Sequence, residues 1–239
     1  IVHFLGNPVN INKINYLRKK YNLKIIEDAA EAHGAIINNK KIGNLGDISC
    51  FSFYANKVLT SGEGGMVCTN NKKYYKKMSL LKNLGFSKPR FVHKVLGYNF
   101  RMSGIQAALG LSQLEEIESI IRKKIKIVQE YKKQLKNLKP IIFAEEEENS
   151  RNVYWQVGIR VKTDKNKLVK FLAKNKIDTR NFFFSIKNQP CLKNFIPKSV
   201  PNTLNSNKLW KEGIYLPSSH DLKKTEITKI CNLIKKFFK

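Results

Sequence analysis

The sequence predicts an α/β fold with a mostly parallel sheet, followed by a smaller α+β domain. Residues 1–4 and Leu23–Glu27 are short apolar runs on either side of a helical pattern, which is the order of a β-α-β unit. The second run shows no polar alternation, as expected for a parallel strand that is buried on both faces. Strands and helices form a second group near the C-terminus, so we expect two domains, residues 1–120 and 121–239.

The first of these domains contains further alternating elements. A helix follows the turn at Pro8, residues 36–46 predict a β-hairpin with an Asn-Asn turn, and residues 47–54 predict a strand. Another turn and strand occupy residues 62–69, and the next helix stops at Gly85. The apolar face of the first helix is formed by Ile11, Ile14, Leu17 and Tyr21.

The second half begins with a loop over residues 86–101. A long helical stretch over 105–138 starts apolar and becomes steadily more charged, and the acidic run 145–148 is expected to be a solvated loop. The segment VYWQVGIRV then predicts an alternating strand, NKLVKFLAKNKI a helix and TRNFFFSI a second strand. A closing helix over 225–238 follows the turn at Pro217, which completes the small domain.

Length and composition limit the class of protein. With 239 residues and 42% hydrophobic side chains, the chain can bury a sizeable core, which excludes a disordered protein. No apolar run approaches the roughly 18 residues that cross a bilayer, so no membrane partner is expected. The four cysteines lack CxxC spacing and the four histidines are scattered. We therefore expect free thiols in a reducing cytoplasm and no metal site.

The net charge of +27 invites a nucleic-acid interpretation. The basic residues, however, are mostly lysine, are spread along the whole chain and accompany an excess of Asn and Ile. This pattern indicates a compositional bias and not a localised patch, and no nucleic-acid-binding motif supports the charge. We expect no nucleic acid partner, although a positive surface would steer an anionic substrate toward a cleft.

One lysine, Lys57, stands apart from the others. It follows the apolar aromatic end of a strand and precedes a turn that contains Gly62, Gly64 and Gly65. A lysine in a dry pocket loses proton affinity and becomes an amine nucleophile, as in the Schiff bases that proteins form with pyridoxal phosphate. The alternative is a surface lysine at the end of a strand.

Asp28 stands where the strand 23–27 ends. Ligands of open α/β sheets bind at the carboxyl ends of the strands. An aspartate at such a position can pair with the pyridine nitrogen of pyridoxal phosphate and keep the ring an acceptor of electrons. The alternative is that Asp28 caps the turn that follows.

Several motifs occur in a fixed order along the chain: IIEDAAEAHGA from Ile25, KKIGNLGDISCFSFYANKVLTSGEGGMV from Lys40 and LGYNFRMSGIQAALGLSQLE from Leu96. With TRNFFF near Arg180 and GIYLPSSHDL near Pro217, they resemble the DegT/DnrJ/EryC1/StrS family of sugar-nucleotide aminotransferases. These are pyridoxal phosphate enzymes of the fold-type I transferase class. The lysine segment looks closest to the GDP-perosamine synthase type within the family.

The resemblance implies roles for individual residues. Lys57 would be the catalytic lysine that holds the cofactor, and Asp28 would pair with its ring nitrogen. Ser52 would contact the cofactor phosphate, the alternative being a buried serine bonded to backbone. Glu31 matches a position beside the ring where many relatives carry Gln. His33 is expected to be packed in its turn, with a functional role as the less favoured alternative.

The loop 86–101 carries the remaining implied residues. In the family this loop reaches the active site of the neighbouring subunit, where the counterpart of Asn99 contacts the cofactor phosphate. The protein would then be an obligate homodimer with a shared site. Tyr98 and Arg180 are expected to contact the substrate. A structural loop before a helix N-cap at Ser103 is compatible with the same sequence.

The function implied by the resemblance is transfer of an amino group from L-glutamate to a nucleotide-linked 4-keto-6-deoxy sugar for surface polysaccharide or glycan biosynthesis. GDP and the C4 position are suggested, but neither is fixed by the sequence. Relatives that dehydrate the sugar carry histidine in place of the lysine, so Lys57 favours the transaminase. A non-catalytic or regulatory relative is the alternative. Asp28, Ser52, Lys57 and Asn99 occur together, which argues against it.

The start of the chain carries one further expectation. Ile1 is not Met, and IVHFLGNPV predicts a strand already in progress, so the N-terminal part of the family fold is expected to be missing. In the family, a glycine-threonine phosphate loop and a ring-stacking aromatic stand upstream of the position that matches Ile1. We therefore expect that this chain alone holds the cofactor poorly.

Overall fold

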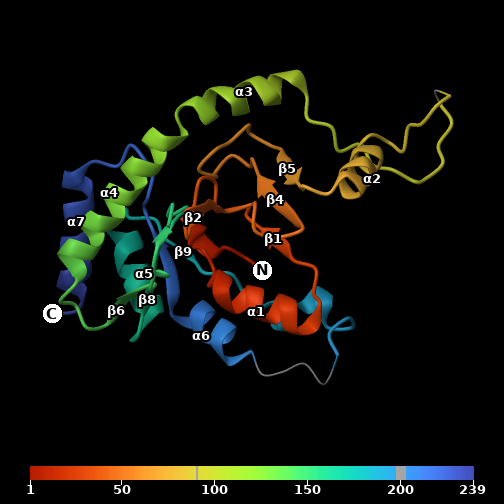
Figure 1. Ribbon diagram of the computed structural model, residues 1–239. Helices are drawn as coiled ribbons and strands as arrows, with labels where there is room; N and C mark the ends of the chain where they lie inside the picture. Colours follow the sequence, from red (N-terminus) through yellow and green to blue (C-terminus); the bar gives the residue numbers. More distant parts are fainter. Residues whose placement is uncertain (90, 198–202) are drawn as a thin grey trace. The chain divides into compact units, whose positions relative to one another are not determined.

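The computed structural model describes residues 1–89, 91–197 and 203–239 (Figure 1). The chain forms two compact units. The first consists of Ile1–Arg122 and Glu146–Trp155, and the second of Lys123–Glu145 and Gln156–Lys239. The first break falls inside helix α4 (Ile117–Leu135), close to the expected boundary at residue 120.

The first unit is built on the sheet β1-β4-β5, formed by β1 (Ile26–Asp28), β4 (Ile48–Ser52) and β5 (Gly65–Cys68). Strands β1 and β4 are parallel and β5 is antiparallel to β4. Val2 adds a parallel bridge to Asp28 on the other side of β1. The parallel pairing predicted between residues 1–4 and the next strand is confirmed by this bridge. The parallel pairing of β1 with β4 brings their carboxyl ends to the same edge.

The expected strand over residues 1–4 is reduced to that bridge. The chain turns at once into the 3₁₀ helix η1 (Phe4–Gly6), in which Leu5 has a φ of 58° and Gly6 a φ of 84°. Such left-handed angles cannot continue a strand. A Cβ on Gly6 would lie 2.6 Å from Cγ2 of Val153, so glycine permits a close approach of two segments.

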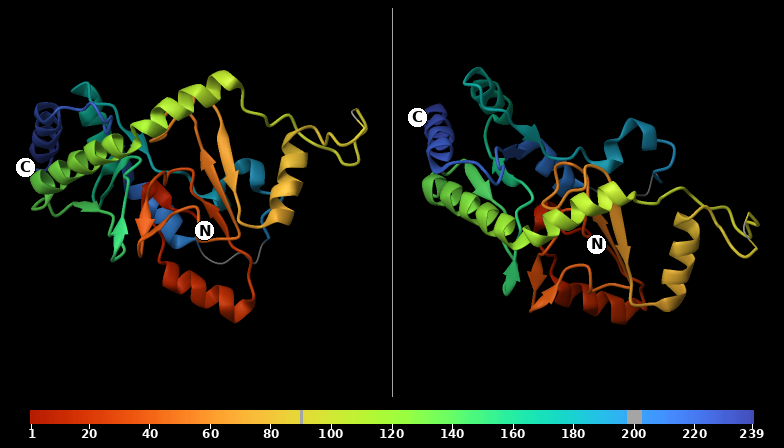
Figure 2. Two further views of the ribbon diagram at one scale, coloured as in Figure 1. Left: turned by 45° about the horizontal axis from the view of Figure 1, so that its top comes forward. Right: turned by 90° about the horizontal axis from the view of Figure 1, so that it is seen from above.

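Three helices surround the first sheet. α1 (Ile11–Tyr21) begins where the Asn10 side chain accepts a hydrogen bond from the N–H of Lys13. α2 (Lys72–Lys82) ends before the predicted stop at Gly85, and α3 (Gly104–Glu115) begins with a Ser103 capping box. Figures 1 and 2 show α1 and α3 on opposite sides of the strands, with α2 and its following loop projecting away. The helix expected over 105–138 is divided between α3 and α4.

A small second sheet completes the first unit. β2 (Ile36–Ile37) and β3 (Lys40–Lys41) form the predicted hairpin, with φ of 46° and 60° at Asn38 and Asn39. β7 (Ser150–Arg151) pairs with β2. This pairing returns residues 146–155 to the first unit, whereas the sequence placed them in a second domain of residues 121–239.

The second unit has one antiparallel sheet of order β6-β8-β10-β9. Its strands are β6 (Ile141–Phe143), β8 (Val157–Val161), β9 (Arg180–Asn181) and β10 (Gly213–Leu216), and its further helices are α5 (Lys165–Lys174), α6 (Leu204–Glu212) and α7 (Lys224–Phe237). Two short 3₁₀ helices, η2 (Ile186–Asn188) and η3 (Pro190–Leu192), follow β9. Ile159, Leu168, Leu172, Ile214 and Ile234 are fully buried side chains of its core. The alternation of β8 and the α+β character are as predicted.

A buried carboxylate fixes the loop that leads into β4. Glu27 is fully buried, and its oxygens accept hydrogen bonds from the N–H groups of Gly43, Leu45 and Gly46. The His3 ring lies 3.3 Å from the same carboxylate. Glu27 thereby ties the end of β1 to the start of β4, which places Asp28 and Ser52 at one edge.

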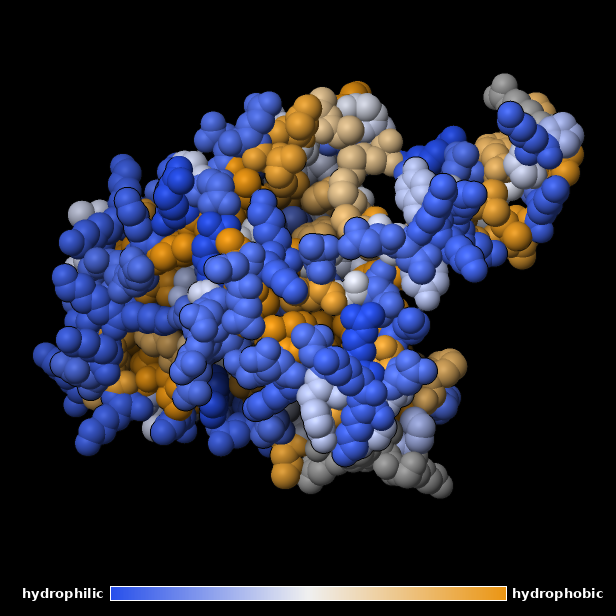
Figure 3. Space-filling model, viewed as in Figure 1, coloured by the Kyte–Doolittle hydropathy of each residue, from blue (hydrophilic) through white to orange (hydrophobic). Residues whose placement is uncertain are grey.

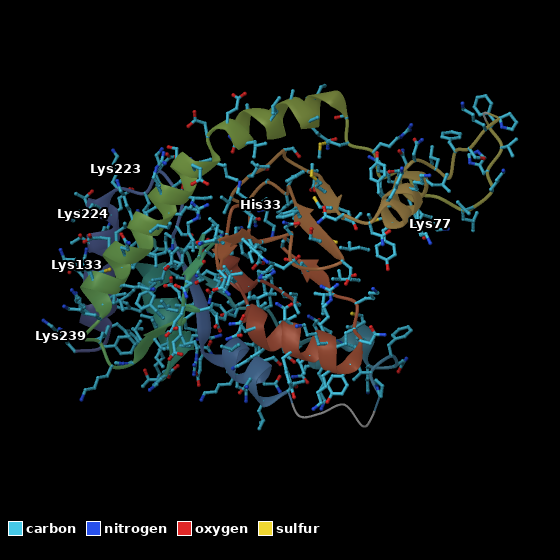
Figure 4. The ribbon with its side chains drawn as sticks, viewed as in Figure 1. His33, Lys77, Lys133, Lys223, Lys224 and Lys239 are labelled. Atoms are coloured by element: carbon cyan, nitrogen blue, oxygen red, sulfur yellow. The ribbon has the colours of Figure 1, made fainter. Side chains whose placement is uncertain are left out.

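The described helices include none that is long and apolar enough to cross a membrane. Within the described residues, no three His, Cys, Asp or Glu side chains form a group that could hold a metal ion. Figure 4 labels Lys77 on α2 of the first unit, and Lys133 on α4 with Lys223, Lys224 and Lys239 at the ends of α7 in the second unit.

Candidate functional site

Lys57 lies in a loop that is held at both ends. The N–H of Phe53 donates to the carbonyl of Gly64 at 2.8 Å, and the N–H of Ser61 donates to the carbonyl of Phe53 at 3.0 Å. The N–H of Lys57 closes a turn on Tyr54. The side chain of Lys57 is 11% exposed. The alternative of an ordinary surface lysine is therefore disfavoured.

A carboxylate accompanies the Lys57 amine. Glu31 Oε1 lies 3.9 Å from Nζ of Lys57, and Glu31 is 8% exposed. Burial lowers the pKa of Lys57, and the carboxylates of Glu31 and Asp28 partly oppose this shift. Burial likewise raises the pKa of Glu31, and the hydrogen bond from the Leu5 N–H and the charge of Lys57 partly oppose this shift. Both partners are thus moved toward their neutral forms.

Asp28 occupies the carboxyl end of β1 and is exposed. Its Oδ1 accepts a hydrogen bond from the N–H of Ala30 at 3.1 Å, so the capping role considered from the sequence is present. The charge of Asp28 also acts on Lys57, Glu31 and the thiol of Cys50. One carboxylate can therefore cap the turn and face the lysine.

Ser52 is the last residue of β4, next to β1. Its Oγ accepts a long hydrogen bond of 3.4 Å from the N–H of Tyr54. Its hydroxyl proton is donated to no residue in the described part of the chain. Ser52 thus keeps a hydrogen-bond donor for a ligand, while the backbone contact matches the structural alternative.

His33 is packed behind the site. It is 4% exposed and lies against Phe51 and Phe53, with ring centroids at 5.4 and 5.9 Å (Figure 4). Neither ring nitrogen has a hydrogen-bond partner within the described ranges. Burial and the charge of Lys57 lower the pKa of His33 to about 4. The ring is neutral at neutral pH, as a packed histidine should be.

Trp155 also contacts the site, and sequence reasoning missed it. The indole Nε1–H donates to the carbonyl of Asn56 at 2.7 Å, and Nζ of Lys57 lies 4.1 Å from the centroid of the Trp155 ring. The sequence predicted only an alternating strand here. No local pattern reveals a contact between residues so far apart.

Tyr98 and Asn99 form their side-chain contacts with neighbours in their own loop. Tyr98 stacks on Phe100 at 5.0 Å, and Asn99 Oδ1 accepts a hydrogen bond from Nε of Arg101 at 3.3 Å. Both residues are exposed. Tyr98 lines an apolar cavity of about 780 Å³ with residues of β5 and α2. Within the described ranges, neither side chain bonds to Lys57.

Arg180 belongs to the second unit. It lies on β9 opposite Tyr215 of β10, and it is exposed. The first unit therefore brings Asp28, Glu31, Ser52 and Lys57 together. Among the described residues, Tyr98 and Asn99 of the same unit form no hydrogen bond or ion pair with them, and Arg180 belongs to the second unit.

The gathered residues fit pyridoxal phosphate by their chemistry. Lys57 supplies an amine with lowered pKa, Asp28 an exposed carboxylate at a strand end and Ser52 an uncommitted hydroxyl donor. The amine can react with the cofactor carbonyl, the carboxylate can pair with the protonated ring nitrogen, and the hydroxyl can donate a hydrogen bond to the phosphate.

Comparisons with known proteins show the family of the chain. A model of the DegT/DnrJ/EryC1/StrS aminotransferase family matches residues 1–235. The chain is 37% identical to GDP-perosamine synthase of Escherichia coli O157:H7, over 99% of this chain and 64% of that protein. It is 36% identical to GDP-perosamine synthase of Vibrio cholerae, over 99% of this chain and 65% of that protein. The chain thus spans less than two thirds of the length of these relatives.

A solved structure supports the fold. Helicobacter pylori PseC, an aminotransferase involved in the biosynthesis of pseudoaminic acid, superposes with a TM-score of 0.92 at 26% identity. The match covers 99% of this chain and 65% of that one. The expected fold-type I transferase architecture is therefore confirmed. The chain belongs to the DegT/DnrJ/EryC1/StrS aminotransferase family.

Proposed function

We propose that the protein is a pyridoxal-phosphate-dependent aminotransferase that moves an amino group from L-glutamate to a nucleotide-linked 4-keto-6-deoxy sugar. One observation carries the proposal: the amine of Lys57, on a side chain that is 11% exposed, lies 3.9 Å from Glu31 and within the field of Asp28, at the shared edge of β1 and β4. The similarity to the GDP-perosamine synthases of Escherichia coli O157:H7 and Vibrio cholerae supports GDP as the nucleotide and a perosamine-like product for surface polysaccharide or glycan synthesis.

Bound pyridoxal phosphate supplies a carbonyl that receives the amino group and a ring that withdraws electrons from the carbon beside it. Lys57 would hold the cofactor through its carbonyl carbon. Once released, Nζ of Lys57 would carry the proton to and from the α-carbon of the amino donor. A lowered pKa suits both tasks, because a neutral amine is nucleophile and base.

Asp28 and Ser52 are proposed to orient the cofactor. A carboxylate beside the ring nitrogen keeps that nitrogen protonated, and the Ser52 hydroxyl donates to the phosphate. Glu31 lies beside the lysine, and burial raises the pKa of its carboxyl group. The non-catalytic alternative is not favoured by any of these observations.

We further propose a homodimer in which Asn99 completes the partner's phosphate site and Tyr98 and Arg180 contact substrate. Supporting this, α3 has no buried residue although it carries Ile105, Leu109, Leu111 and Leu114, and Figure 3 shows apolar side chains along it. An apolar helix of this kind favours burial against another chain. The four free cysteines support a cytoplasmic location.

The test is a direct assay of amino transfer. The protein is incubated with pyridoxal phosphate, L-glutamate and a GDP-linked 4-keto-6-deoxyhexose, and 2-oxoglutarate and the amino sugar are measured by mass spectrometry. We expect both products in equal amounts, their loss in Lys57→Ala and their retention in the control Lys77→Ala, an exposed lysine on α2. Product formation by Lys57→Ala at the wild-type rate would refute the proposal.

A further inference from the structure

Trp155 touches the reactive lysine segment at two places. Its indole N–H donates to the carbonyl of Asn56, which belongs to the peptide bond that joins Asn56 to Lys57, at 2.7 Å. The face of the same ring lies 4.1 Å from Nζ of Lys57, within the range of a cation–π contact. One side chain, 6% exposed, therefore contacts both the backbone and the amine end of this segment.

The contacts continue into a closed circuit. The backbone N–H of Trp155 donates to the carbonyl of Leu5 at 3.0 Å. The N–H of Leu5 donates to Glu31 Oε2 at 2.7 Å, and Oε1 of Glu31 lies 3.9 Å from Nζ of Lys57. Each contact thus links one residue to the next, from Trp155 through Leu5 and Glu31 to Lys57. The position of the amine therefore depends on the placement of the indole.

The backbone on either side of this circuit is strained. Tyr154, directly before the indole, has a φ of 50°, and Leu5 has a φ of 58°. Left-handed angles in non-glycine residues cost about 1–2 kcal/mol each and persist where the surroundings enforce them. Here Asn152 Oδ1 accepts a hydrogen bond from the N–H of Tyr154 at 2.8 Å, and the N–H of Val153 donates a hydrogen bond to the carbonyl of Gly6. Two strained residues flank the same small site, which is where function tends to retain strain.

We propose that Trp155 is a positioning residue that fixes the amine of Lys57 for amino transfer, through its hydrogen bond to Asn56 and its ring face. This rests on the proposed function. The charged and titratable groups that act on Lys57 are Glu31, Asp28 and His33, and the largely buried indole lies over its amine. Removal of the indole admits water to the amine and frees its rotamers.

The test measures Lys57 itself, without cofactor. Competitive labelling of lysines with acetic anhydride over a pH series, followed by peptide mass spectrometry, gives the midpoint of Lys57 in wild type, Trp155→Leu and Trp155→Phe. We expect the midpoint to rise by about one pH unit in Trp155→Leu, because burial is the main cause of its lowered pKa. Trp155→Phe keeps a ring but loses the N–H, so its Lys57 midpoint should lie between those of the wild type and Trp155→Leu.

Trp210→Phe is the matched control. Trp210 forms a second lysine–indole pair with Lys165 at 5.6 Å, in the other unit, so its replacement should leave the Lys57 midpoint unchanged. In folded variants, an unchanged Lys57 midpoint in both Trp155 variants would overturn the proposal. If Trp155→Leu does not fold, Trp155→Phe decides alone, by a raised or an unchanged midpoint.

A second readout separates positioning from general stability. In the amino-transfer assay, kcat should fall about tenfold in Trp155→Phe with little change in KM, because misplacement by 1 Å can cost up to about a hundredfold. An unchanged kcat would contradict positioning for catalysis. The labelling result does not require transferase activity. A shifted midpoint in an inactive protein therefore refutes only the proposed function, whereas an unshifted midpoint in an active one refutes only the role of Trp155.

Discussion

Replacement of Glu27 by alanine should destabilise the protein strongly. The fully buried carboxylate accepts three backbone hydrogen bonds from the loop at residues 43–46, at 2.9 Å from Gly43 and 2.7 Å from Leu45, and a shorter one from Gly46. The His3 ring adds a fourth contact. Alanine offers no acceptor, so three N–H groups and one imidazole lose their partner together.

The magnitude follows from these contacts. A buried donor left without an acceptor costs about 1–3 kcal/mol. The loop is only partly buried and water can reach some of the freed groups, so we take about 1 kcal/mol for each N–H and about 1 kcal/mol for the space left behind. The sum, about 4 kcal/mol, is a large share of the roughly 5–15 kcal/mol that stabilises a domain. It corresponds to a fall in Tm of roughly 8–16 °C for a chain of this size.

Thermal and urea unfolding would measure this effect, with Glu148→Ala at an exposed acidic position as the control. The pH dependence gives a second check. Burial raises the pKa of Glu27, but hydrogen bonds from His3 and the loop outweigh it and hold the pKa below its ordinary value. The difference between wild type and Glu27→Gln should therefore be full above about pH 4.5 and shrink as the pH falls further. A loss below 1 kcal/mol in Glu27→Ala would refute this reasoning.

Three further changes have defined outcomes. Burial lowers the pKa of Lys124 to about 8, so the folded protein loses this proton at a lower pH than the unfolded chain. The free energy of unfolding of the wild type should therefore rise between about pH 8 and 10.5. Urea titrations should show that this rise disappears in Lys124→Met and persists in Lys123→Met, a control at an exposed lysine. In Gly213→Ala the new Cβ would meet Phe182 and lie 2.5 Å from the carbonyl of Leu209, and calorimetry should show a loss of about 3 kcal/mol. Asn71→Ala removes the N-cap of α2 and should cost about 1 kcal/mol by denaturant titration, and no change would mean that water replaces the cap.

The centre of the site could be predicted from sequence because it depends on parallel strands. Asp28 and Ser52 follow apolar runs that pair as β1 and β4, and parallel neighbours end at the same edge. Lys57 follows within one loop, so its distance from that edge is limited by chain length. The hairpin at Asn38 and Asn39 was predictable for a similar reason, since two adjacent asparagines tolerate the left-handed angles of a tight turn.

The remaining features depend on contacts that no local pattern encodes. Trp155 reaches Lys57 across almost a hundred residues, because β7 adds to the edge of β2 and carries the following segment with it. The turn at Leu5 replaces an expected strand, since its angle is set by distant partners, Glu31 and Trp155. The pairing of β7 with β2 also places residues 146–155 in the first unit, whereas the predicted second domain runs without a break from 121 to 239. Roles for Tyr98, Asn99 and Arg180 stay predictions, because they concern a substrate and a second subunit.

The most direct measurement identifies the residue that carries the cofactor. The protein is incubated with pyridoxal phosphate and treated with borohydride, which fixes the cofactor to the amine that holds it, and the modified peptide is found by mass spectrometry. We predict one phosphopyridoxyl group on Lys57, absent from Lys57→Ala and still present in Lys77→Ala. Modification scattered over exposed lysines, or none at all, would contradict Lys57 as the cofactor-bearing residue.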